Sequence, residues 1–285
     1  MSNWHMQKLT LTLGADLHCG DRPLGFVART LPYVPAHIPW YALVPALVAR
    51  LKLPDRYESY ARVERFFDKI LRFTPFFPLQ GDEPQFPWQS AEARLTSHYG
   101  VALSYADRGA RDNHMFETEV LPRFAPDGAP TRLQGFVFWR PFQEDELTLD
   151  AQGRCNGSSL HDLIGECQWG GQRNKGFGSI AEVVVDKAGD DHAFFAESDL
   201  TGELPAITLH NNQRAPVFLQ YDPAIEPGIR GSIKPLVGRR FAKERGSGLA
   251  AEDCAIVWDV GWQSQVEQPL ILTLADRRSA AARAR

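Results

Sequence analysis

Residues 170–178 contain the residue types that bind an anion. The segment reads Gly-Gly-Gln-Arg-Asn-Lys-Gly-Phe-Gly and places two cations, Arg173 and Lys175, among four glycines. Because glycine has no Cβ and accepts positive φ, successive backbone N–H groups of such a loop can face one anion. The two cations add donors that suit phosphate. The segment predicts an anion-binding loop. Its expected contact residues are Gly170, Gly171, Arg173, Asn174, Lys175, Gly176 and Gly178.

The elements predicted around this loop restrict the class of ligand. In nucleotide-binding loops of the P-loop and dinucleotide types, the glycines follow a strand and open a helix. Here a short helix precedes the loop and a strand follows it, and Lys175 is followed by glycine rather than by Ser or Thr. This order disfavours nucleotide binding. The alternative to a binding loop is a plain connection between the helix and the strand.

Apolar periodicity predicts the elements that position the loop. Helix patterns begin near residue 39, at residue 57 and at residue 160, the last after a segment that can cap it. The predicted elements follow one another as strand, two helices, strands, short helix and strand. This is the order of a ferredoxin-like βαββαβ unit with insertions. The predicted fold class is therefore α+β. The predicted strands are residues 8–13, 95–105, 115–121, 133–139 and 180–185.

The last third of the chain predicts short strands separated by glycine and proline turns, and no strong helix. We expect residues 1–190 to form the ferredoxin-like domain and residues 191–285 a smaller strand-rich module. Residues 73–88 alternate prolines with aromatic rings and predict an ordered irregular loop. Residues 108–114 are polar and predict a mobile loop, within a protruding region near residues 106–130.

The composition excludes several classes of protein. The chain has 285 residues, 44% of them hydrophobic, and its formal net charge of −4 argues against indiscriminate coating of nucleic acid. A local basic patch is compatible with this charge, since Lys234, Arg239 and Arg240 lie in a cation-rich stretch. The apolar runs are too short to span a membrane, and the polar N-terminus predicts no signal peptide. We expect a cytoplasmic protein without a membrane partner.

The sequence predicts neither a metal site nor a cofactor. Cys19, Cys155, Cys167 and Cys254 lie far apart, which suits free structural thiols better than disulfides or zinc. The acids do not have the spacing of a carboxylate metal site, and the chain contains no Gly-x-Ser-x-Gly elbow of a serine hydrolase.

Four segments resemble the RAMP superfamily of CRISPR-associated proteins. The glycine loop is similar to that family's Gly-Gly-x-Arg-x-x-Gly-x-Gly loop, which precedes the last strand of a ferredoxin-like RNA-binding domain. His18 and Gly20, with the later Pro-Tyr-Val-Pro run, resemble the end of its first strand and the entry to its first helix. Residues 115–122 resemble its hydrophobic-Phe-x-x-Glu-x-Leu-Pro strand, and residues 235–239 resemble a C-terminal piece of its larger members.

The resemblance implies a subunit of an RNA-guided effector complex that binds CRISPR RNA. Backbone subunits of type III complexes carry a cleaving aspartate before the Pro-Tyr element, where Asp21 is the only acid here. Processing endonucleases keep the glycine loop near the C-terminus, whereas residues 179–285 follow it here. We therefore expect a non-catalytic Cas-five-like subunit, of a type III or type III-derived system, that caps the repeat-derived 5′ handle of the guide. Its expected partners are CRISPR RNA, Cas-seven-like backbone subunits and a large or nuclease subunit.

Three alternatives stay open: a guide-processing endoribonuclease, a Cas-seven-like backbone subunit and a plain protein-binding module. A general acid or base role for His37, His98 or His114 belongs to the endoribonuclease. For Phe177, core packing is expected over base stacking. Phe76, Phe77 and Trp88 are expected to be exposed toward partners. In the capping role the expected RNA contacts besides the glycine loop are His18, Arg111, His114, Lys234, Arg239 and Arg240.

Overall fold

The structure, a computed structural model, describes residues 3–89, 95–103, 110–186, 194–210, 212–221, 228–241, 249–264, 271–274 and 281–284. The structure describes by the backbone alone residues 22, 110–114, 220, 236–241, 249–255, 271–274 and 281–284. Among the described residues, no helix has the length and apolar character needed to cross a membrane.

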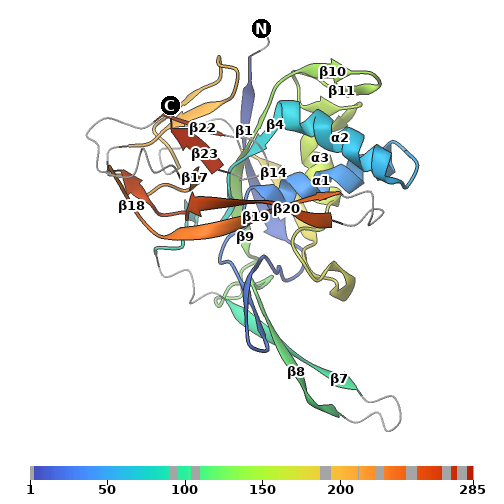
Figure 1. The fold of residues 1–285 in the computed structure, drawn as a ribbon, viewed down its shortest axis with the longest axis vertical. Helices are drawn as coiled ribbons and strands as arrows, with labels where there is room; N and C mark the ends of the chain where they lie inside the picture. Colours follow the sequence, from blue (N-terminus) through green and yellow to red (C-terminus); the bar gives the residue numbers. More distant parts are fainter. Residues whose placement is uncertain are drawn as a thin grey trace.

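A six-stranded antiparallel sheet lies at the centre of the fold (Figure 1). Its strands are β1 (His5–Leu13), β4 (Leu71–Phe73), β5 (Phe77–Gln80), β6 (Glu83–Pro84), β9 (Arg132–Trp139) and β14 (Ile180–Val185). Their order is β14-β1-β9-β5-β6, with β4 also paired to β9. Strand β1 lies between β14 and β9, so that its Thr10 is opposite Val184 of β14 and Gln134 of β9.

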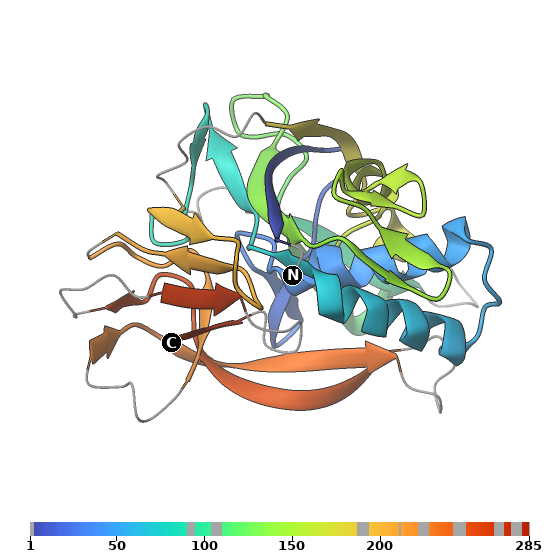
Figure 2. The same cartoon turned by 90° about the horizontal axis from the view of Figure 1, so that it is seen from above.

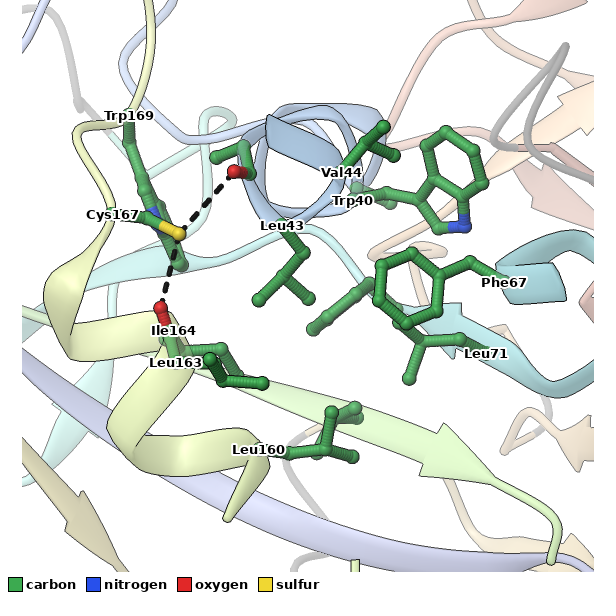
Figure 3. Packing of buried hydrophobic residues seen from close by; sticks show 14 of the residues in the cluster. Trp40, Leu43, Val44, Phe67, Leu71, Leu160, Leu163, Ile164, Cys167 and Trp169 are labelled. Carbon is green, nitrogen blue, oxygen red and sulfur yellow. Dashed lines mark hydrogen bonds between the residues drawn. The ribbon is translucent and has the colours of Figure 1, made fainter. Parts of the chain in front are cut away.

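Three helices pack on one face of this sheet: α1 (His37–Arg50), α2 (Tyr57–Ile70) and α3 (Leu160–Glu166). Alternate residues of β1, namely Leu9, Leu11 and Leu13, are buried in this core because side chains of a strand alternate between its faces. Figure 3 shows Phe67 of α2 and Ile164 of α3 in the same cluster. The apolar stripe of each helix therefore meets the apolar side of the sheet.

The opposite face of the sheet packs against the C-terminal strands. Phe136 and Phe138 of β9 pack there with Phe194, while Val137 between them points into the helix-side core. In Figure 2 most of the C-terminal strands gather on one side of the molecule and the helices on the other. The strands are β15 (Glu197–Asp199), β16 (Ala206–Thr208), β17 (Phe218–Gln220), β19 (Ile233–Phe241), β20 (Leu249–Trp258), β22 (Ile271–Leu274) and β23 (Ala281–Ala284), in the order β15-β16-β22-β23-β17-β20-β19.

Three smaller sheets are also present. One is a meander of β10 (Phe142–Glu144), β11 (Leu147–Leu149), β12 (Arg154–Cys155) and β13 (Ser158–Ser159), and another pairs β18 (Ile229–Arg230) with β21 (Gln263–Ser264). The third contains β2 (Gly20–Leu24), β3 (Val27–Thr30), β8 (Ala110–Val120) and β7 (Thr96–Leu103), in that order. Strands β7 and β8 project from the body as a long two-stranded ribbon (Figure 1).

The α+β class and several predicted elements are confirmed. Helices α2 and α3 and strand β14 begin at the predicted residues. Ser159 is the N-cap of α3, since its Oγ accepts a hydrogen bond from the backbone N–H of Asp162 over 3.2 Å. Helix α1 begins at His37 and holds Pro39 in its first turn, where the missing N–H costs no helical hydrogen bond. The division of the chain near residue 190 stays a prediction.

The prediction of an irregular loop at residues 73–88 is wrong, because β5 and β6 lie within it. Phe77 lies opposite Gln134 of β9, and this pairing buries Phe76 and Phe77 completely. These two rings are therefore not exposed toward partners, and Trp88 is half-buried. The prolines interrupt the alternating pattern on which strand prediction depends, although they are tolerated at sheet edges.

The predicted mobile loop at residues 108–114 is also wrong for the part that the structure describes. Strand β8 begins at Ala110, which lies opposite Leu103 of β7, so Arg111 and His114 belong to a strand. The exposed Tyr99 and Met115 show that this ribbon stands in solvent. A solvated ribbon accepts polar residues, and the apolar alternation that marks a half-buried strand is then lost.

Candidate nucleic-acid interface

The glycine loop is fixed at both ends to the chain that follows β1. The backbone N–H of Gly171 donates to the carbonyl oxygen of His18, and that of Gly178 donates to the carbonyl oxygen of Asp16, each over 2.8 Å. Gly178 has φ +82°, and a Cβ there would overlap the carbonyl oxygen of Trp169. A glycine is therefore required at this position by both its backbone angle and its close approach.

The tip of the loop presents its cations to solvent. Residues Arg173–Lys175 form a single 3-10 turn, with Gln172 and Gly176 in the left-handed conformation on either side. Arg173, Asn174 and Lys175 are all exposed. The turn itself contains no acid, so its charge is available to an anionic ligand.

His18 lies beneath the loop. Its side chain is buried, and its Nδ1 lies 2.8 Å from the carbonyl oxygen of Glu119 on β8. A Cβ added to Gly171 would be 3.3 Å from the His18 ring. These contacts fit the structural role for His18, in which it joins the chain that follows β1 to β8 and to the loop. Its contact with RNA stays a prediction.

The projecting ribbon meets the loop at its base. The ammonium of Lys175 lies 4.5 Å from the centroid of the Phe116 ring, and the Phe116 ring covers Gly100 across the ribbon. Beside it, the His98 ring lies 5.2 Å from the Phe177 ring, centroid to centroid. Phe177 is half-buried and contacts this histidine at the surface. Cations and rings thus alternate around the loop, as in proteins that bind single-stranded nucleic acid.

Arg123 and Phe124 extend this surface after the end of β8. The guanidinium of Arg123 lies 4.8 Å from the centroid of the Phe124 ring, which is 49% exposed. These two residues and Phe116 are not among the contacts predicted from the sequence. Contacts between distant segments bring them to the loop: Leu121 bridges to Leu17, and the backbone N–H of Arg123 donates to Asp16. No local pattern encodes these contacts.

Lys234 lies in a different part of the molecule. Its ammonium is 2.8 Å from a carboxylate oxygen of Asp259 and 4.8 Å from the centroid of the Phe218 ring. The Tyr33 hydroxyl donates to the same carboxylate over 3.3 Å, and burial raises the pKa of Tyr33 well above its ordinary value. The Lys234 charge is therefore paired inside the protein, and an RNA contact by it stays a prediction.

The remaining predicted contacts lie at strand positions of which only the backbone is described. Arg111 and His114 are on β8, and Arg239 and Arg240 are on β19. Their roles stay predictions.

The described cysteines do not take part in this surface. Cys19, Cys155 and Cys167 are buried and free, and burial raises the pKa of each thiol to about 12. Cys167 Sγ lies 3.3 Å from the carbonyl oxygen of Ala42, inside the helix-side core (Figure 3). Among the residues that the structure describes, no three His, Cys, Asp or Glu side chains converge as metal ligands.

No protein-family profile and no curated protein matches this sequence. A chain of the Type III-B Cmr-beta complex bound to cognate target RNA and AMPPnP matches the structure with a TM-score of 0.50 at 10% identity, over 90% of this chain and 85% of that chain. A chain of Type III-B Cmr-beta bound to cognate target RNA has a TM-score of 0.42 at 12% identity over the same shares. The first likeness shows that this protein has the fold of a chain in the Type III-B Cmr-beta complex.

Proposed function

We propose that this protein is a non-catalytic RNA-binding subunit of a CRISPR effector complex, of type III or a type III-derived system. In this role it caps the repeat-derived 5′ handle of the guide RNA. The central sheet supports a ferredoxin-like RAMP domain. Its strands β14, β1, β9 and β4 neighbour one another in the order 4-1-3-2 of a βαββαβ unit, if β1, β4, β9 and β14 are counted as the first to fourth strands. The shared fold with a chain of an RNA-bound effector complex supports the same assignment.

One observation carries the proposal: the exposed cations of the glycine loop lie beside exposed rings at the base of the ribbon. Lys175 contacts the Phe116 ring, and His98 contacts the Phe177 ring next to it. Phosphates fix the position of an RNA strand through arginine, lysine and backbone N–H groups, while unpaired bases stack on rings. The surface offers both kinds of contact within one loop and one ribbon.

The exposed apolar face of the ribbon supports partner binding in addition to RNA binding. One face of β7 and β8 presents four apolar side chains that are each more than 40% exposed: Tyr99, Val101, Leu103 and Met115. Phe116 lies on the other face, toward the loop. In the proposed complex the expected protein partners are backbone RAMP subunits and a large or nuclease subunit, besides CRISPR RNA.

The test is to express the chain alone and together with its genomic neighbours, and to sequence the RNA that copurifies. The R173A/K175A variant is compared with R56A/R154A, which removes two exposed arginines elsewhere. We expect uniform repeat-derived 5′ ends in the assembled complex, lost with R173A/K175A and kept with R56A/R154A. Absence of RNA from every sample overturns the proposal.

A second candidate, the guide-processing endoribonuclease, is favoured by one observation. His98 Nε2 lies 2.5 Å from a carboxylate oxygen of Asp16, which is the arrangement of an oriented general base. The purified chain, incubated with repeat RNA in EDTA, distinguishes the candidates. A subunit that only caps the guide leaves the RNA intact, whereas a nuclease of this type produces a 2′,3′-cyclic phosphate end that disappears with H98A.

A further inference from the structure

Asp16 connects three segments at the edge of the glycine loop. Its backbone carbonyl accepts the N–H of Gly178 over 2.8 Å. One carboxylate oxygen accepts the backbone N–H of Arg123 over 2.6 Å, and the other lies 2.5 Å from Nε2 of His98. The loop, strand β7 and the segment after β8 are therefore all held by this residue.

The contact with Asp16 determines which nitrogen of His98 is available to a ligand. An ionised carboxylate only accepts hydrogen bonds, so Nε2 carries the proton in this pair. In the neutral ring, Nδ1 is then an acceptor, which repels a phosphate oxygen. When the ring gains a proton, Nδ1 becomes a donor and the side chain becomes a cation. The His98 side chain is 49% exposed, so a ligand can reach it.

Lys175 and Arg123 supply cations to the surface on which His98 lies. His98 of β7 lies opposite Thr118 of β8. Its side chain is on the same face of the ribbon as Phe116, whose ring contacts Lys175. Lys175 comes from the loop and Arg123 from the segment after β8. The carboxylate of Glu119, the next residue on β8, is 2.7 Å from Arg29 and thus already neutralised. Among the described residues, Asp16 is the acid whose carboxylate contacts the ring.

This inference rests on the RNA-binding function proposed above. We propose that His98, held by Asp16, is a proton-dependent phosphate contact that tightens RNA binding as the pH falls. Imidazoles change charge between about pH 5 and pH 8. The positive charge is present at the lower pH and is lost as the pH rises, so affinity is greater at the lower pH. A hydrogen bond to a charged group corresponds to a change in affinity on the order of tenfold.

The experiment measures the affinity of the full chain for a fluorescein-labelled single-stranded RNA by fluorescence anisotropy, at about pH 5.5 and about pH 8. Ionic strength is held constant at each pH, and a salt series is recorded. The test variant is H98Q. The matched control is H161Q, because His161 on α3 is also half-exposed and lies 3.2 Å from a carboxylate oxygen of Asp162. Circular dichroism checks that each variant is folded.

Wild type and H161Q are expected to bind RNA about tenfold more tightly at the lower pH than at the higher pH. The affinity of H98Q is expected to be the same at both pH values and equal to that of wild type at the higher pH. At the lower pH, H98Q also loses about 0.7 from the salt slope, which is one phosphate contact on a single strand.

The possible failures are distinguishable. If H98Q keeps the pH step of wild type, His98 is not the contact, and the RNA-binding function still stands. If wild type binds no RNA at either pH, the proposed function fails and this inference fails with it.

Discussion

The ammonium of Lys175 lies 4.5 Å from the centroid of the Phe116 ring, which joins the tip of the glycine loop to the projecting ribbon. The two residues are far apart in the sequence, and each has a feature that RNA binding uses: a cation for phosphate and a ring for a base. Their proximity turns a charged loop into a composite surface.

The double variant R173A/K175A is expected to weaken RNA binding through the loss of two phosphate contacts. For a single strand, this loss lowers the magnitude of the slope of log affinity against log salt by about 1.4. A salt series with a labelled RNA measures the slope. The control R56A/R154A removes the same charge from other exposed sites and should leave the slope unchanged. Equal slopes for both variants would show that the loop does not contact phosphate.

The variant F116A is expected to lose the stacking of one base, which corresponds to about 1–3 kcal/mol of binding free energy. Met115 is the neighbouring residue on the opposite, exposed face of the ribbon, so M115A is the matched control. Affinity for single-stranded RNA, measured at one salt concentration, compares the two. A greater loss in M115A would place the RNA on the other face of the ribbon.

The variant G178A is expected to destabilise the protein by about 2 kcal/mol or more. The alanine must adopt a strained positive φ, and its Cβ would overlap the carbonyl oxygen of Trp169. G176A separates the two effects. Gly176 has φ +85° but open space around its Cβ, so its cost is about 1 kcal/mol. Denaturant unfolding measures both, and equal losses would rule out the carbonyl overlap as a cause.

The variant K234M tests whether Lys234 has a structural role or contacts RNA. Its removal leaves the half-buried carboxylate of Asp259 without its ammonium partner, and we expect a loss of about 1–2 kcal/mol in unfolding free energy. The double variant K234M/D259N should recover part of that loss. A smaller salt slope in RNA binding, with unchanged stability, would instead identify Lys234 as a phosphate contact.

The buried thiols predict a specific pH dependence of stability. Burial raises the pKa of Cys19, Cys155 and Cys167 from 9.0 to about 12 in the folded state. The folded state therefore favours the neutral thiol: this stabilisation is complete below pH 9 and is lost as the pH rises toward about 12.

In a C254S background, a thiol reagent at about pH 8 should react with the buried cysteines only on unfolding. Rapid reaction of the native protein would contradict the burial of these thiols.

Local patterns in the sequence predict much of the secondary structure. Local signals of this kind are the apolar stripe of α2, the Ser159 cap of α3 and the run of β-branched residues in β14, which all depend on neighbours within a few residues. Patterns of this kind fail where pairing with distant strands decides the structure. Phe77 belongs to a strand because it pairs with β9. The polar residues that begin at Ala110 belong to a strand because β8 pairs with β7.

By itself, the sequence determined the α+β class, the place of the glycine loop between a helix and a strand, and the exposed charge of Arg173 and Lys175. These depend on periodicity, capping and the conformational freedom of glycine, which are local properties. The tertiary structure alone decided that His98 contacts Asp16 and that Lys234 pairs with Asp259. Residues so far apart in the chain meet only through strand pairing and core packing, so no spacing in the sequence records their contact.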